Sequence, residues 1–180
     1  MAQQNGRHQF DGIVLPHLDA AYNLARWLTR DNSAAEDVVQ EAMFRALKYF
    51  STFNGINARA WVLQIVRNVA YKHLRSTQDV KTVSIDHDSS ERDEFVPPEA
   101  LIDPGDDPVA TLIRQREHGY LTALLERLPT ELRECLILRE LEDLSYNDIA
   151  QITNVPLGTV MSRLWRARRF LIETVQQESC

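Results

Sequence analysis

Residues 144–171 read LSYNDIAQITNVPLGTVMSRLWRARRFL, a pattern that predicts two helices joined by a short turn. Ser145 stands where an N-cap is expected, and Asp148 three residues later completes a capping box. Residues 153–155 form a tight connection, and Pro156 suits the first turn of the next helix, where its missing N–H costs nothing. The stretch therefore predicts a helix-turn-helix.

The second of these helices has two distinct faces when it is projected at about 100° per residue. Its core face consists of Val160, Leu164, Ala167 and Leu171. Its opposite face consists of Thr159, Ser162, Trp165, Arg166 and Arg169, flanked by Arg163 and Arg168. Hydroxyl and guanidinium groups on such a helix suit base edges and phosphates in a major groove. A merely solvated face would explain the arginines but not an outward Trp165, so DNA binding is favoured.

An earlier helix is predicted to start at Ser33, with Ser33 as N-cap and Glu36 three residues later. Its core side consists of Val39, Ala42, Met43, Ala46 and Phe50. Its other side carries Asp37, Gln40, Glu41, Phe44 and Lys48. An aromatic residue ringed by charged groups is typical of a protein-binding hot spot, although single exposed apolar residues are also common.

The next predicted helix, residues 58–75, also has two faces. Its buried face consists of Val62, Ile65, Val66 and Val69. A stripe on the other side consists of Gln64, Arg67, Asn68, Tyr71 and Arg75. Guanidinium groups with an aromatic ring suit a nucleic-acid strand, and the polar turn at residues 54–57 could present side chains to an unstacked base. A solvated basic helix would show the same stripe, so both interpretations remain open.

The net charge of −6 over 180 residues is unevenly distributed. Residues 77–108 contain ten acidic and two basic residues and several prolines, a composition typical of a flexible linker. Apolar residues at helical spacing dominate on both sides of it. We therefore predict an all-α fold: two small helical domains, residues 1–76 and 109–180, joined by a flexible acidic linker. The two domains are expected to fold and bind almost independently.

Enzymatic and metal-binding functions find no support in the sequence. The five histidines and two cysteines are scattered, without the spacing of a metal site or a catalytic triad. We therefore expect no catalytic residues, no metal and no cofactor. The first residues are polar and no apolar run is long enough to span a bilayer, which predicts a cytoplasmic protein without membrane insertion.

Both halves together resemble the extracytoplasmic-function (group IV) sigma factors of bacterial RNA polymerase. The resemblance rests on SAAEDVVQEAMFRA at 33–46 and AWVLQIVRN at 60–68, then on Leu128-Pro129, LSYNDIA at 144–150 and PLGTVMSRLWRAR at 156–168. With their helices, these motifs cover most of the chain except the linker. Many members of the family have leucine where this chain has Val62, and arginine where it has Met161.

The resemblance implies roles for three sets of residues. A set that binds core RNA polymerase would be Asp37, Gln40, Glu41 and Phe44. A set that reads and melts the −10 element of promoter DNA would be Asn54, Ile56, Asn57, Arg67, Asn68, Tyr71 and Arg75. A set that reads the −35 element would be Thr159, Met161, Ser162, Arg163, Trp165, Arg166 and Arg169. The resemblance also implies an anti-sigma factor as a partner.

The alternative function is a stand-alone helix-turn-helix transcriptional regulator that binds DNA without joining the polymerase. A response regulator of that kind would need alternating strands and helices in the N-terminal half. The patterns of this half are wholly helical, which favours the sigma-factor interpretation.

Overall fold

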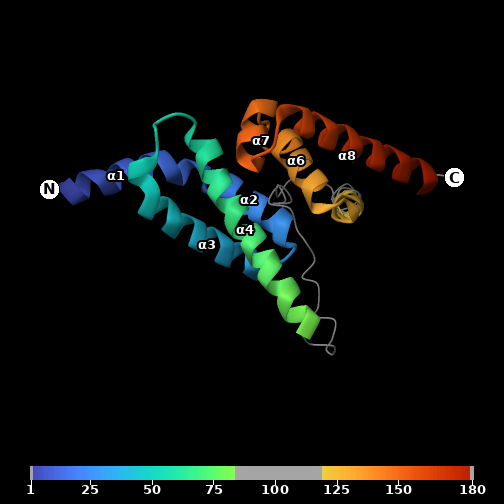
Figure 1. Ribbon diagram of the computed structural model, residues 1–180, viewed down its shortest axis with the longest axis horizontal. Helices are drawn as coiled ribbons and strands as arrows, with labels where there is room; N and C mark the ends of the chain where they lie inside the picture. The colour runs from blue at the N-terminus through green and yellow to red at the C-terminus, as the bar shows by residue number, and fades with distance from the viewer. Residues whose placement is uncertain (1, 84–118, 179–180) are drawn as a thin grey trace, which may run out of the picture.

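A computed structural model describes the backbone of residues 2–83 and 119–178, and within these ranges the chain is helical and contains no strand (Figure 1). This confirms the predicted all-α fold, with one group of helices on either side of residues 84–118. Most of the predicted linker, including its predicted flexibility, lies outside the described residues.

The N-terminal domain packs three long helices against one another after an initial helix, α1 (Ala2–Val14). These are α2 (Leu18–Thr29), α3 (Asn32–Tyr49) and α4 (Ala58–Val83), with short 3-10 turns η1 (Leu15–His17) before α2 and η2 (Phe50–Thr52) after α3. The core between them includes Leu24, Leu28, Val38, Ala42, Leu63, Val66 and Ala70. Burial of each large side chain stabilises the fold by about 1.5–3 kcal/mol.

The start of α3 differs from the prediction. The N-cap is Asp31, whose backbone is extended and whose Oδ1 accepts a hydrogen bond from the Ala34 N–H at 2.6 Å. Ser33, predicted to cap this helix, is already inside its first turn. Both residues belong to the preferred capping types, so the sequence pattern alone favoured the wrong one. The helix ends at Tyr49, one residue before Phe50, which is the last residue of the predicted core side and lies in η2.

Helix α4 is longer than predicted, since it continues past Arg75 to Val83. No glycine or proline occurs between Gly55 and Pro97, so no backbone signal stops the helix after its apolar pattern ends. Its predicted buried face is confirmed for Val62, Val66 and Val69, while Ile65 is only partly buried.

The C-terminal domain begins with a helical segment at 119–127, followed by α6 (Thr130–Glu140), α7 (Tyr146–Thr153) and α8 (Leu157–Glu178). Asp143 between α6 and α7 and Asn154 after α7 both adopt positive φ, and Asn154 lies in the predicted connection at residues 153–155. Helices α7 and α8 form the predicted helix-turn-helix.

Hydrogen bonds at the starts of α7 and α8 define where these two helices begin. The Ser145 hydroxyl accepts a hydrogen bond from the Asp148 N–H at 3.1 Å, which confirms the cap. The Pro156 carbonyl accepts the first helical hydrogen bonds of α8, from Thr159 and Val160. On the predicted core face of α8, Val160, Leu164 and Ala167 are buried and Leu171 is partly buried.

The two domains are in contact, contrary to the expectation that they behave almost independently. Helix α2 packs against α6, and α4 packs against α7. In Figure 1, α4 accordingly runs between the other N-terminal helices and the helix-turn-helix domain. One face of α4 completes the N-terminal core, and the opposite face meets the C-terminal domain.

The position of the α3 cap gives a test of this fold. Asp31→Ala should lower the free energy of unfolding by about 1 kcal/mol, because it removes the acceptor for a backbone N–H at the helix start. Ser33→Ala is the matched control and should change stability little. Urea unfolding followed by circular dichroism measures both, and an equal loss from Ser33→Ala would contradict a helix that starts after Asp31.

Candidate nucleic-acid interface

The outward face of α8 carries the residues predicted to read the −35 element. Trp165 is 60% exposed and Met161 is 48% exposed, and Ser162, Arg166 and Arg169 are also exposed. Thr159 is half-buried. Side chains of these types on an exposed helix face can reach base edges and phosphates.

Two contacts organise this face before any ligand arrives. The Arg169 guanidinium lies over the Trp165 ring at 5.2 Å from the centroid and also pairs with Glu173 at 2.6 Å. Together they hold a planar cation beside an aromatic surface. Such a pair favours the stacking and phosphate contacts for which arginine is suited.

Arg163 is placed differently from the other six members of this set. Its side chain is half-buried and, with Arg67, Asn68 and Tyr71 of α4, lines a cavity of about 410 Å³ between the two domains. Its guanidinium also acts on the buried Cys135 thiol, where it opposes the rise in the thiol pKa that burial causes. The structure therefore separates Arg163 from the outward face of α8 on which Trp165 and Arg166 lie.

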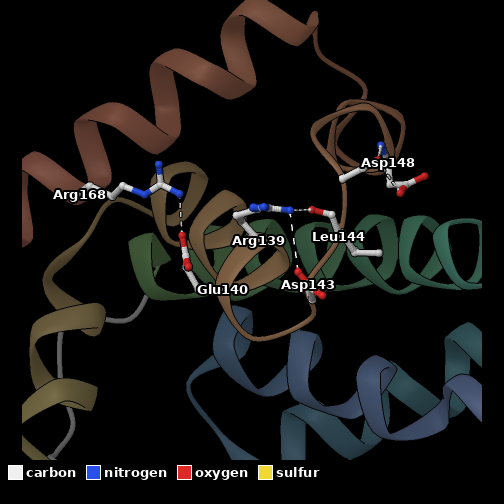
Figure 2. A network of polar contacts seen from close by, with 7 residues as sticks. Arg139, Glu140, Asp143, Leu144, Asp148 and Arg168 are labelled. Atoms are coloured by element: carbon white, nitrogen blue, oxygen red, sulfur yellow. Dashed lines mark hydrogen bonds and ion pairs between the residues drawn. The ribbon is translucent and has the colours of Figure 1, made fainter.

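A polar network supports α7 and α8 from below (Figure 2). Arg139 of α6 donates to the Leu144 carbonyl at 2.8 Å and lies 3.9 Å from Asp143, which fixes the turn before α7. Arg168 of α8 pairs with Glu140 of α6 at 2.7 Å. These contacts orient the helix-turn-helix on α6.

The residues predicted to bind polymerase lie together on α3. Asp37, Gln40, Glu41 and Phe44 are all exposed, and Phe44 has 65% of its surface accessible. Glu41 pairs with Arg45 at 2.7 Å on the same helix. A large aromatic side chain within an acidic and polar patch has the composition of a protein-binding surface.

The loop between η2 and α4 presents the first part of the predicted −10 set. The Asn54 side chain accepts a hydrogen bond from the Ile56 N–H at 3.0 Å, and Gly55 adopts φ +78° at the tip. This turn leaves Ile56 72% exposed. Asn57 accepts a hydrogen bond from the Ala60 N–H at 3.0 Å and so starts α4. Phe53 and Trp61 pack beside the loop with ring centroids 5.0 Å apart.

The second part of the predicted −10 set lies along α4, and its four residues fall into an exposed pair and a partly buried pair. Asn68 and Arg75 are exposed. Arg67 and Tyr71 are partly buried because both contact Glu134 of α6, Arg67 Nε at 2.5 Å and the Tyr71 hydroxyl at 3.1 Å. The Arg67 guanidinium lies 4.4 Å from the centre of the Tyr71 ring. Two predicted DNA contacts are thus engaged within the chain.

The electrostatics of this cluster follow from the burial of Glu134. Burial raises the pKa of the Glu134 carboxyl, and the Arg67 guanidinium opposes that rise. Burial and the nearby Glu134 carboxylate both raise the pKa of Tyr71, which keeps its hydroxyl protonated as a donor. In this cluster, the Arg67 cation and the neutral Tyr71 hydroxyl therefore both donate to the Glu134 carboxyl group.

Several residues at the domain boundary were missed by the sequence analysis. Glu134, Glu142 and Arg59 belong to this group, since Arg59 Nη2 lies 2.5 Å from Glu142. One signal was available: Glu134 directly precedes the apolar run that begins at Cys135, and charged residues are rarely buried without a partner. The pattern gave no indication of where that partner lies, because Arg67 is distant in sequence.

Within the described residues, no group of histidine, cysteine, aspartate and glutamate side chains could hold a metal ion. None of the helices in those residues combines the length and the apolarity that a membrane crossing requires.

Comparisons with known proteins agree with this geometry. Residues 13–80 match the family described as Sigma-70 region 2, and residues 118–171 match Sigma-70, region 4. The chain is 32% identical to the RNA polymerase sigma-H factor of Pseudomonas aeruginosa, over 97% of this chain and 90% of that protein. It is 36% identical to the ECF RNA polymerase sigma-E factor of Escherichia coli K12, over 78% of this chain and 73% of that protein.

Solved structures show the same architecture. The sigma factor RpoE, crystallised in complex with the anti-sigma factor NepR from Bartonella quintana, superposes with a TM-score of 0.71 at 28% identity, over 93% of this chain and 97% of that one. CnrH, in complex with the cytosolic domain of CnrY, superposes with a TM-score of 0.65 at 19% identity, over 95% and 90%, and supports the fold alone.

The two matched regions are those of a transcription initiation factor rather than of a stand-alone regulator. The chain belongs to the sigma-70 family, in its extracytoplasmic-function group. It is an alternative sigma factor, a class that acts in promoter recognition and transcription initiation and is not enzymatic.

The buried thiol beside this interface gives a second test. Burial raises the pKa of Cys135 to about 11, and the neighbouring Glu134 adds to the rise. Because only the thiolate reacts, a variant with Cys180→Ser should be alkylated very slowly by iodoacetamide near neutral pH. The rate should increase as the pH approaches the thiol pKa, and unfolding in guanidinium should abolish the protection. Fast reaction of the folded variant near neutral pH would contradict this burial.

Proposed function

We propose that this chain binds core RNA polymerase through the exposed α3 surface and directs it to promoters through two DNA-reading surfaces. The observation that carries the proposal is the outward face of α8, where Trp165 and Arg166 are exposed and no acidic residue occurs between Pro156 and Ile172. A surface of this composition at a helix-turn-helix suits a major groove.

The two domains would bind different promoter elements. The α8 face, with Thr159, Met161, Ser162, Trp165, Arg166 and Arg169, would read the −35 element. Arg163 would contribute less to this than predicted, because it is half-buried at the domain boundary. The loop with Asn54, Ile56 and Asn57, and the stripe with Arg67, Asn68, Tyr71 and Arg75, would bind the strands of the −10 element as they open.

Further parts of the proposal concern partners and location. The similar RpoE was crystallised with the anti-sigma factor NepR, which supports an anti-sigma partner for this chain as well. The chain itself would catalyse no reaction, use no cofactor and act in the cytoplasm, where RNA polymerase works on DNA.

The experiment that tests this function is run-off transcription with core polymerase, followed by mapping of the start sites. Core enzyme with the chain should initiate at defined promoters at which core enzyme alone is silent. The chain should also co-elute with core enzyme on gel filtration at micromolar concentration. Absence of both results would contradict the proposal.

The polymerase surface can be tested at its aromatic residue. Phe44→Ala should weaken binding to core polymerase by about 2 kcal/mol if Phe44 is a hot spot. Helicity should not change, because the side chain is exposed and supports no core. Tyr49→Ala is the control, since Tyr49 is also exposed on α3 but lies about 140° around the helix. Equal losses from both variants would argue against a specific anchor at Phe44.

The two DNA-reading surfaces should give different defects on one mapped promoter. Arg166→Ala should weaken closed-complex binding by about 1–3 kcal/mol if Arg166 makes a bidentate base contact, and more protein should restore opening. Asn68→Ala should retain closed-complex binding and reduce opening, because Asn68 lies on the α4 stripe. Permanganate footprinting beside a binding assay separates them. Normal opening by Asn68→Ala with normal binding by Arg166→Ala would show that both assignments are wrong.

A further inference from the structure

The cavity of about 410 Å³ between α4, α6 and α8 has the size of a small-molecule site. Its lining comes from Arg67, Asn68, Tyr71, Lys72 and Arg75 of α4, from Glu131 of α6 and from Arg163 of α8. Every one of these side chains carries a polar or charged group. The cavity therefore suits a polar ligand rather than an apolar one.

Positive charge predominates in this lining. Arg67 donates to a buried glutamate of α6, and the other three cations, Lys72, Arg75 and Arg163, face a single lining carboxylate, that of Glu131. The chain as a whole has a net charge of −6, so this cavity is a local exception. A concave surface of one charge sign concentrates small ions of the opposite sign.

The two cations on the α4 side keep their donors available. Lys72 and Arg75 are exposed, and neither makes an ion pair or a side-chain hydrogen bond within the part of the chain that the structure describes. They are three residues apart on one helix, so they lie on the same side of it. Together they can bind an anion that carries more than one charge.

The cation on the α8 side also has an unused donor. The Arg163 side chain is half-buried, and its Nη1 is buried with no hydrogen-bond partner among the described residues. A buried donor without an acceptor is unfavourable. A turn of this guanidinium toward an anionic oxygen in the cavity would remove that penalty.

We propose that this cavity is a binding site for a small anion with a diphosphate group, held by Lys72 and Arg75 from α4 and by Arg163 from α8. Arginine binds phosphate oxygens through paired N–H donors, and lysine adds a compact charge. A diphosphate has two linked anionic groups, so it can contact cations of two helices at once. A single ion of the size of sulfate cannot do this as well.

The arrangement favours a small ligand over a nucleic-acid strand. A strand is bound by cations that follow its backbone, whereas the cations here converge on one cavity from two helices. The site itself does not depend on the proposed DNA-reading roles. One consequence does rest on them: Arg75 belongs to the proposed −10 set, so a bound diphosphate would compete with that strand.

Isothermal titration calorimetry of the full-length chain with sodium pyrophosphate tests the site. The buffer contains no magnesium, because the metal would complex the probe. The wild type should bind one pyrophosphate per chain, and bound pyrophosphate should raise the melting temperature by mass action. Sulfate should bind about tenfold more weakly, because it places fewer charges near the three cations.

Exposed residues that belong to no proposed DNA-reading set provide the decisive variants. Lys72→Ala should weaken pyrophosphate binding about tenfold, and Glu131→Gln should tighten it about threefold, because they remove an attractive and a repulsive charge. A purely structural role for Glu131 would not produce a gain in affinity. Lys48→Ala and Glu36→Gln are the matched controls, since they make the same charge changes on exposed surface of α3 outside the cavity.

The contribution of α8 is tested separately. Arg163→Gln should also weaken pyrophosphate binding, whereas Arg166→Gln, on the exposed outward face of the same helix, should not. Circular dichroism checks that Arg163→Gln keeps native helicity, because this side chain is half-buried. If it loses helicity, the variants at the exposed Lys72 and Glu131 decide the question.

Adenosine diphosphate distinguishes the two sources of a diphosphate group. Tighter binding of adenosine diphosphate than of pyrophosphate would assign the site to a nucleotide. Weaker binding would assign it to a free diphosphate. Both results support the site, provided that Lys72→Ala reduces the binding.

Three results would overturn the site: no saturable binding of either diphosphate at millimolar concentration, sulfate binding as tight as pyrophosphate binding, or equal losses from Lys72→Ala and Lys48→Ala. Lys72-dependent binding of a single-stranded oligonucleotide without pyrophosphate binding would assign the cavity to a strand and would also overturn it. Normal run-off transcription by a chain that binds no pyrophosphate would leave the proposed function standing. Pyrophosphate binding by a chain that fails in run-off transcription would leave only the site standing.

Discussion

The ion pair between Arg67 and Glu134 determines how the two halves of the chain sit on each other. It joins a helix of the N-terminal domain to a helix of the C-terminal domain at a point where the carboxylate has no access to water. A buried charge without its partner is strongly unfavourable, so the two helices must meet in one register. The contacts of Arg59 with Glu142 and of Asn57 with Asp148 follow from that register along the same face of α4.

Local signals predicted the helices well, because capping and periodicity act within a few residues. Ser145 caps α7, the helix ends at Thr153 where the connection was predicted, and Val160 and Leu164 are buried, all as the sequence indicated. The failure at the start of α3 has the same local origin. Asp31 and Ser33 are both good caps, and the choice between them depends on how the chain leaves α2.

The candidate site was less predictable, since the environment of its cations is set by residues distant in sequence. A helical projection places Arg67, Asn68 and Tyr71 on one stripe but cannot show that α6 covers part of it. Arg163 illustrates the same limit on α8. Its angle on the helix places Arg163 at the flank of the predicted DNA-binding face. Its side chain nevertheless lies beside residues of α4 and α6. Periodicity defines faces, and tertiary contacts decide which of them meet solvent.

The pairing of cations also bears on how an acidic chain selects promoter DNA. Arg168 and Arg169 on α8 pair with Glu140 and Glu173, as Arg67 pairs with Glu134. A DNA phosphate must displace a carboxylate at each of these positions, so the free energy gained from non-specific DNA binding is smaller. Affinity for duplex DNA depends mainly on uncompensated cations, and these three arginines are compensated. Stable promoter binding would therefore draw on contacts made by the assembled polymerase, and the proposed base contacts of Arg166 would decide which DNA is held.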